Sequence, residues 1–180
     1  MQTFDQYGGN YRDVVQRAID FAGLEYEFFV KAKVRVVEHL AAKFDRAADV
    51  RLLDVGCGIG ILHDHLGGKF ARICGADVSK VSIETAKRRH PEIEYRVMEG
   101  NKIPYPSDAF DIVTAINVLH HIAPDLRPNF VLELKRVTRP HGVVCIIEHN
   151  PFNPLTRLAV FRCPFDRDAD RKSTRLNSSH

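Results

Sequence analysis

Short apolar segments alternate with segments of helical periodicity along most of this chain, and that alternation restricts the possible folds more than any other feature. The apolar segments have the length of strands, and several are apolar almost throughout, as in strands covered by helices on both faces. They span residues 50–55, 72–77, 93–98, 110–116 and 142–148. The sequence therefore predicts an α/β fold with a doubly wound, mostly parallel sheet of about five strands.

Helical periodicity fills the segments before and between these strands. The expected helices span residues 11–22, 25–44, 61–66, 79–90 and 125–137. In the segment 25–44, the apolar side chains recur largely along one side. We expect Phe28 and Phe29 to belong to that side and to pack the helix against the sheet, although aromatic residues near the amino terminus, such as Tyr7 and Tyr11, could also shield a bound ligand.

The 180 residues suit one domain with a sizeable core. No run reaches the roughly 20 apolar residues of a membrane helix, and the first ten residues do not resemble a secretory signal. We therefore expect a soluble, cytoplasmic protein without a membrane partner. Its oligomeric state stays open. Since no two of the four cysteines form a C-x-x-C pair, reduced thiols are expected.

The last ten residues differ from the rest because they are polar, rich in serine and without periodicity. We expect a disordered tail at 171–180. Its amino-acid sequence resembles translated read-through of a sequencing adapter, which would make this segment foreign to the native chain. The tail holds three of the 26 basic residues, so the remaining 23 balance the 23 acidic residues. Such a neutral body gives no reason to expect a nucleic-acid partner.

Three glycines at alternate positions follow the first expected strand, in the segment LLDVGCGIG. Without Cβ atoms, Gly56, Gly58 and Gly60 permit tight turns and close approach of a ligand, although an ordinary glycine turn would look alike. A dinucleotide-binding fingerprint needs its third glycine at position 61, where this chain has Ile61. An NAD-dependent oxidoreductase therefore stays only as a weaker alternative.

The series D-x-G-x-G-x-G at residues 54–60 instead resembles the first motif of class I S-adenosylmethionine-dependent methyltransferases. This resemblance implies the Rossmann-like methyltransferase fold and S-adenosylmethionine as the cofactor. It also implies that the cofactor is bound by the motif residues Asp54, Gly56, Cys57, Gly58 and Gly60. On this basis, residues 1–48 form a helical cap, 49–150 the cofactor-binding core and 151–170 a segment after the fifth strand.

Further cofactor-binding residues are expected where the later strands end. Asp77 follows the second strand and suits the two ribose hydroxyls, although it could instead cap the next helix, as Ser79 could. The resemblance adds Val78 beside it. After the third strand, it places Glu99 and Gly100 beside the adenine, and after the fourth it places Asn117 near the methionine end of the cofactor.

Histidines near the last strand ends are the candidates for acid–base chemistry. His120 and His121 lack the carboxylate or cysteine that would complete a metal-ligand set, so no metal is expected. His120 could act as an acid or base, or pack under the cofactor loop, and His149 is the second candidate. Glu148 beside it could contact the acceptor or belong to a loop braced by prolines.

The segment EHNPFNPLT at 148–156 is similar to bacterial methyltransferases of the type 11/12 group, which act on small molecules. The resemblance therefore implies methyl transfer to a small-molecule acceptor, with positioning as the main catalytic contribution. The family fold continues past the fifth strand, so the chain is expected to be C-terminally truncated, with an exposed apolar edge and poor solubility. A non-catalytic fragment that binds the cofactor is the alternative function.

Overall fold

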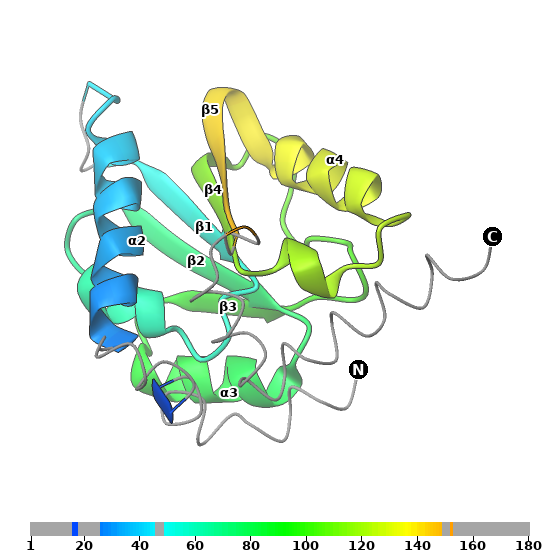
Figure 1. Ribbon diagram of the computed structural model, residues 1–180. Helices are drawn as coiled ribbons and strands as arrows, with labels where there is room; N and C mark the ends of the chain where they lie inside the picture. Colours follow the sequence, from blue (N-terminus) through cyan, green and yellow to red (C-terminus); the bar gives the residue numbers. More distant parts are fainter. Residues whose placement is uncertain (1–15, 18–25, 46–48, 149–151, 153–180) are drawn as a thin grey trace.

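Five parallel strands form one sheet in the computed structural model (Figure 1). The structure describes residues 16–17, 26–45, 49–148 and 152. In spatial order the strands are β3 (Glu94–Val97), β2 (Arg72–Asp77), β1 (Arg51–Val55), β4 (Phe110–Ile116) and β5 (Thr138–Ile147). The strand order reverses at β1, so the sheet is doubly wound, as the sequence predicts.

Helices cover both faces of the sheet. The helix α2 (Tyr26–Ala41) packs on the face that includes Leu52 and Ile112, while α4 (Arg127–Val137) packs on the opposite face with Leu53 and Val113. Neighbouring strand residues thus point alternately into two separate apolar clusters. Because both faces are covered, the central strands are apolar nearly throughout.

The helix α3 (Lys80–Arg89) begins and ends with side chains suited to those positions. Ser79 is the N-cap, and its hydroxyl accepts a hydrogen bond from the Ser82 amide at 3.1 Å. Basic residues fill the last turn, which is favourable at the negative end of the helix dipole. The buried Ile83 and Ala86 pack this helix against Tyr95 of β3.

The predicted strands are confirmed, with a correction at β5. This strand begins at Thr138, directly after α4, and not at 142 as expected from the apolar run. Thr138 pairs with Phe110, and the register then shifts before Val143 pairs with Ile112. The polar residues that hid the start of the strand lie in this irregular stretch, where His141 has a φ of 64°.

The buried side of α2 also differs from the expected one. Phe28 is 61% exposed and Phe29 is 37% exposed, so neither packs the helix onto the sheet as expected. Val30, Val34, Val37 and Ala41 form the buried side instead, at spacings of three and four residues. A second difference is that residues 61–65 form the 3-10 helix η3 (Ile61–His65) and not an α-helix.

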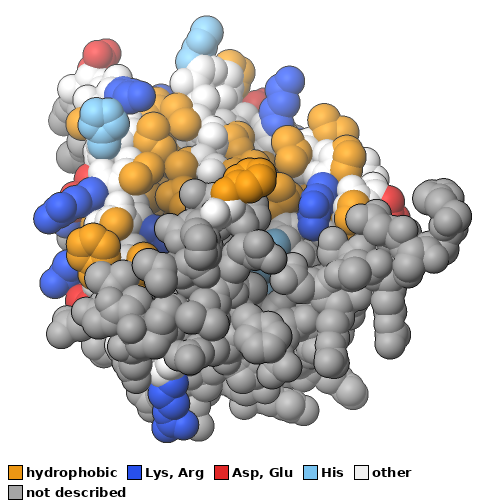
Figure 2. All heavy atoms as spheres, viewed as in Figure 1, with side chains coloured by type: hydrophobic (Ala, Val, Ile, Leu, Met, Phe, Trp, Pro, Cys, Tyr) orange, Lys and Arg blue, Asp and Glu red, His pale blue; other side chains and the backbone are white. Residues whose placement is uncertain are grey.

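Several expected features lie outside the described residues. These are most of the helix expected at 11–22, the aromatic residues Tyr7 and Tyr11, residue His149, and the tail at 171–180. Among the described helices, none has both the length and the apolar character needed to cross a membrane. Figure 2 shows hydrophobic side chains gathered on the face between α2 and α4, with Lys and Arg side chains around them.

Candidate functional site

The carboxyl ends of all five strands lie at one edge of the sheet because the strands are parallel. Backbone hydrogen bonds join neighbouring ends: Met98 donates to the Asp77 carbonyl at 2.8 Å, and Gly56 donates to the Ala76 carbonyl at 2.7 Å. On the other side, Asn117 donates to the Ile147 carbonyl at 2.7 Å. The residues predicted after each strand are thereby placed along a single edge, which in this class of sheet is the ligand-binding edge.

The glycine loop at 56–60 leaves β1 with left-handed backbone at each of its three glycines. Their φ angles are 75° at Gly56, 53° at Gly58 and 77° at Gly60. A Cβ at Gly56 would lie 2.2 Å from Cγ2 of Val118, so β1 and the turn after β4 touch there. Among the described residues, a Cβ at Gly58 would meet nothing within 4 Å. Gly58 therefore presents open backbone, as a ligand cradle requires.

Asp77 joins this loop to the start of α3. One carboxylate oxygen accepts the Gly58 amide at 2.8 Å and the other accepts the Ser79 amide at 2.8 Å. Burial raises the pKa of Asp77, while these amide hydrogen bonds act against that increase. Each oxygen keeps a second lone pair, so the carboxylate can still accept hydrogen bonds from a ribose. Ser79 caps the helix, which leaves Asp77 available for this role.

The other residues predicted to bind the nucleoside lie beside Asp77. Val78 is 38% exposed, so its apolar side chain is accessible for packing against a flat aromatic ring. Glu99 and Gly100 are exposed in a turn after β3, where the Glu99 carbonyl accepts the Lys102 amide at 3.2 Å and Gly100 has a φ of 59°.

Asn117 follows β4 with a φ of 56°, a left-handed conformation that asparagine tolerates better than most residues. Its neighbour Val118 contacts the first glycine of the loop, as described above. Asn117 thus lies next to the point where the strand order reverses, between β1 and β4. That is the position at which ligands enter doubly wound sheets.

A histidine–glutamate pair closes this edge beyond β4. The Nδ1 atom of His120 lies 2.6 Å from Oε2 of Glu148, and Oε1 accepts the amides of Val118 at 3.0 Å and Leu119 at 2.7 Å. Burial acts to raise the pKa of Glu148, but the hydrogen bonds from His120 and the two amides outweigh it and lower the pKa. The ionised carboxylate therefore orients the imidazole by its Nδ1 atom.

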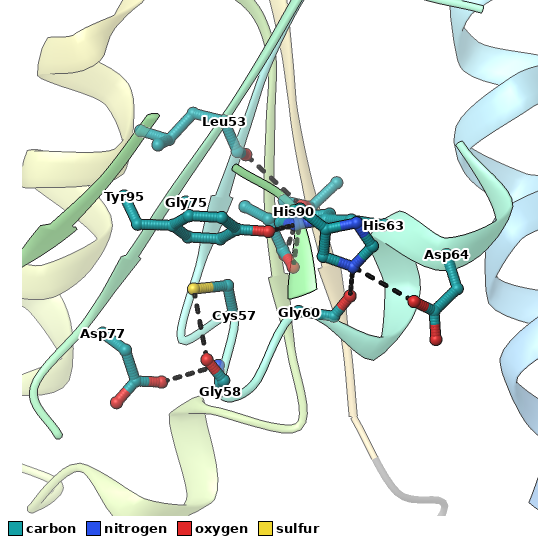
Figure 3. Close-up of polar contacts among 12 residues, drawn as sticks. Leu53, Cys57, Gly58, Gly60, His63, Asp64, Gly75, Asp77, His90 and Tyr95 are labelled. Atoms are coloured by element: carbon teal, nitrogen blue, oxygen red, sulfur yellow. Dashed lines mark hydrogen bonds and ion pairs between the residues drawn. The ribbon is translucent and has the colours of Figure 1, made fainter. Parts of the chain in front are cut away.

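A buried polar cluster lies beneath the glycine loop (Figure 3). It includes Asp54, which the resemblance implies as a cofactor-binding residue and which is only 4% exposed, and its other members were not predicted from the sequence. Asp54 Oδ1 accepts the Thr114 hydroxyl at 2.7 Å, and Asp54 Oδ2 lies 3.4 Å from Nε2 of His63. The His63 Nδ1 atom lies 2.6 Å from the Tyr95 hydroxyl. The only local indication was the alternation along β1 and β4. Asp54 and Thr114 each lie two residues after an apolar side chain that packs toward α2, which places both on that buried face.

The cysteine in the loop lies in surroundings that disfavour its thiolate. Burial raises the pKa of the Cys57 thiol well above its ordinary value, and the nearby negative charges of Asp77 and Asp54 raise it further. Its sulfur lies 3.7 Å from the Gly58 carbonyl oxygen. Cys57 thus contributes packing under the loop. Across the described part of the chain, no cluster of three potential metal ligands occurs.

A hollow of about 230 Å³ lies at the opposite edge, where β1 and β4 begin, and it is lined in part by Asp111 and Arg139. The Asp111 carboxylate is 1% exposed. It lies 2.5 Å from Nε of Arg139 and accepts the Arg51 amide at 2.7 Å. Its charge is therefore balanced by neighbouring arginines, and the hollow is separate from the carboxyl edge.

Known proteins resemble this chain over the same region. The profile of a family described as "Methyltransferase domain" matches residues 53–146, just over half of the chain. A methyltransferase, GfsG, from Streptomyces halstedii is 33% identical over 125 residues, which cover 66% of this chain and 44% of the relative. A ubiquinone biosynthesis O-methyltransferase from Mesorhizobium japonicum is 31% identical, covering 63% of this chain and 49% of that protein.

A solved structure, the [4+2]-cyclase SpnF, matches with a TM-score of 0.56 and 28% identity, covering 66% of this chain and 45% of that one. This chain spans about half the length of the curated relatives it matches. The region of likeness includes the glycine loop, Asp77, Glu99 and Asn117, which together make up most of the carboxyl edge.

Proposed function

Because this chain belongs to the methyltransferase-domain family, we propose that it transfers the methyl group of S-adenosylmethionine to a small-molecule acceptor. The observation that carries the proposal is the carboxylate of Asp77 beside the open backbone of Gly58. A nucleoside offers two ribose hydroxyls to such a carboxylate, and an amino-acid portion fits where no side chain fills the space. S-adenosylmethionine contains both parts.

Different residues of the carboxyl edge would bind different parts of the cofactor. Asp77 would accept the ribose hydroxyls, and Val78 would pack against the adenine, with Glu99 and Gly100 beside it. Asn117 would border the methionine portion, which would lie over the glycine loop, with the buried Asp54 beneath that loop. S-adenosylmethionine would supply a methyl group on a positively charged sulfur, and the main task of the protein is to align the acceptor and exclude water.

We propose a hydroxyl group as the acceptor. The Mesorhizobium japonicum relative is an O-methyltransferase, and a hydroxyl must lose its proton during transfer. An imidazole that donates its Nδ1 hydrogen to a carboxylate has its basic lone pair at Nε2. His120 would therefore remove the proton, with Glu148 holding the ring in the required tautomer. His149, outside the described residues, is the second candidate for the base.

Titration calorimetry with the full chain tests the cofactor. We expect saturable binding of S-adenosylhomocysteine, the demethylated product, at one site and much weaker binding of NAD. Tighter binding of NAD would instead support an oxidoreductase, and absence of binding to either compound by the folded chain would remove the proposal.

Methyl transfer needs a separate measurement because the similar fold of SpnF belongs to a cyclase. We expect transfer of a labelled methyl group from S-adenosylmethionine to a panel of phenols. Binding of S-adenosylhomocysteine without transfer to any phenol, amine or thiol would favour the non-catalytic alternative.

A further inference from the structure

The buried polar cluster beneath the glycine loop makes direct contact with the last glycine of that loop. We define the loop-floor cluster as Asp54, His63, His90 and Tyr95, which are 4%, 2%, 9% and 3% exposed. These residues come from β1, η3, the end of α3 and β3. Figure 3 shows the Tyr95 ring pointing toward His63, while Asp77 points toward Gly58 from the other side of the loop.

Three of the cluster residues hold Gly60 in place. The Gly60 carbonyl accepts the His63 amide at 3.1 Å and lies 3.1 Å from Nε2 of His90. A Cβ on Gly60 would lie 2.8 Å from the Tyr95 hydroxyl, so this hydroxyl packs directly against the glycine. With a φ of 77°, Gly60 makes the turn from the loop into η3.

The Tyr95 phenol and the Asp54 carboxylate constrain the hydrogen-bond roles of the two His63 ring nitrogens. Burial raises the pKa of the Tyr95 phenol, so its hydroxyl keeps a hydrogen to donate to Nδ1 of His63 in the tautomer that leaves this nitrogen unprotonated. The hydrogen of that imidazole is then on Nε2, which faces Asp54 at 3.4 Å without the geometry of a full hydrogen bond. A phenol that donates to Nδ1 thus favours the tautomer that points a donor at the carboxylate.

Stability alone does not explain a buried polar group of residues such as the loop-floor cluster. Apolar side chains of similar volume often stabilise a core as well or better, whereas polar partners fix one relative position because each depends on the other. Here the fixed position is that of the loop between Asp54 and Gly60. The same loop holds the open backbone of Gly58, which is the center of the proposed site.

Resting on the proposed function, we propose that the loop-floor cluster positions the glycine loop for S-adenosylmethionine, with Tyr95 and His63 as positioning residues. Neither side chain contacts the reacting atoms, since both lie below the loop on the α3 side of the sheet. Tyr95 acts through His63 and Gly60. The loop is expected to keep its overall fold without the Tyr95 hydroxyl but to lose its fixed position.

The test compares Tyr95→Phe with Tyr105→Phe. Tyr105 is also a buried tyrosine, and its hydroxyl donates to the carbonyls of Gly75 and Glu94, each at 3.2 Å, on the opposite face of the sheet. Titration calorimetry with S-adenosylhomocysteine should show a dissociation constant raised about threefold to tenfold in Tyr95→Phe and unchanged in Tyr105→Phe.

Hydrogen exchange without ligand provides a second readout. The Gly60 amide donates to the Cys57 carbonyl at 3.0 Å, and its exchange should accelerate in Tyr95→Phe more than that of amides in β1 or β4. A purely structural role would accelerate exchange throughout the core, and to the same degree in Tyr105→Phe. That result, or unchanged affinity in Tyr95→Phe, overturns the inference.

His63→Gln carries the test if Tyr95→Phe does not fold, because the amide keeps a donor for Asp54 but lacks the Nδ1 acceptor for Tyr95. We expect the same loss of affinity, and wild-type affinity in this variant overturns the inference. If the unsubstituted chain itself binds no S-adenosylhomocysteine, the proposed function fails and this inference fails with it. Wild-type binding combined with unaffected variants removes the inference alone.

Discussion

Glu148 binds His120 with one carboxylate oxygen, at 2.6 Å from Nδ1, while its other oxygen accepts the two backbone amides that precede His120. The side chain and the turn that carries it are thus held by the same carboxylate. Since Glu148 follows β5 and His120 follows β4, the pair also ties the two strand ends together. In the proposed function, Glu148 therefore both orients the candidate base and holds the turn that carries it.

Replacing Glu148 by Gln should lower kcat for a hydroxyl acceptor by about 10- to 100-fold, because a neutral amide no longer favours the required imidazole tautomer or stabilises its protonated form. The affinity for S-adenosylhomocysteine should be unchanged. Steady-state kinetics and calorimetry measure these two quantities.

Glu133→Gln is the matched control, since Glu133 of α4 likewise binds one basic side chain, Arg136, and one backbone amide, that of Ile103. It should leave kcat unchanged. Equal effects of the two substitutions on kcat would contradict a role for Glu148 in the site.

The lowered pKa of Glu148 predicts a pH-dependent contribution to stability. A carboxyl whose pKa is lower in the folded state stabilises the fold wherever it is ionised. Its contribution is complete above the ordinary glutamate pKa of about 4.3 and disappears as the pH falls through the lowered folded value. The difference in Tm between wild type and Glu148→Gln should therefore be largest near neutral pH and shrink in acid. A difference that grows toward low pH would contradict this assignment.

Gly58→Ala and Gly68→Ala separate backbone strain from ligand contact. Both glycines have left-handed backbone, with φ of 53° and 74°, and at neither would a Cβ meet an atom of the described part of the chain within 4 Å. Each substitution should cost about 1–2 kcal/mol of folding free energy from the backbone alone. Only Gly58→Ala should also raise the dissociation constant of S-adenosylhomocysteine, by about tenfold or more. Equal affinities in calorimetry would place the ligand away from the loop.

Asp77→Ala should weaken cofactor binding by about 10- to 100-fold, because hydrogen bonds to a charged acceptor contribute about 1.5–3 kcal/mol. Because the pKa of Asp77 is raised, its carboxylate should become protonated at a pH above the ordinary aspartate pKa of about 3.9. Wild-type affinity should therefore begin to fall at that higher pH on acidification. Calorimetry across pH measures both effects. The exposed Asp125, before α4, supplies the control variant Asp125→Ala, and unchanged affinity in Asp77→Ala would exclude the ribose assignment.

The local patterns in the sequence were sufficient for most of the fold. Strands β2 and β4 have the bounds expected from their apolar runs, whereas β1 is one residue shorter at its start and β3 is one residue shorter at each end. These elements follow from periodicity and from the position of glycine, which are properties of neighbouring residues. The start of β5 and the buried side of α2 were not predictable in this way, because each depends on which partner the segment packs against.

The sequence by itself determined the family, the parallel sheet and the edge at which the candidate cofactor residues gather, since a strand, its following glycine or acid, and its helix are contiguous in the chain. Only the tertiary structure decided how those residues are supported. Glu148 meets His120, Asp77 meets Gly58, and Tyr95 meets His63 across separations of 28, 19 and 32 residues. Such contacts arise from the packing of whole strands and helices, which no short stretch of sequence encodes.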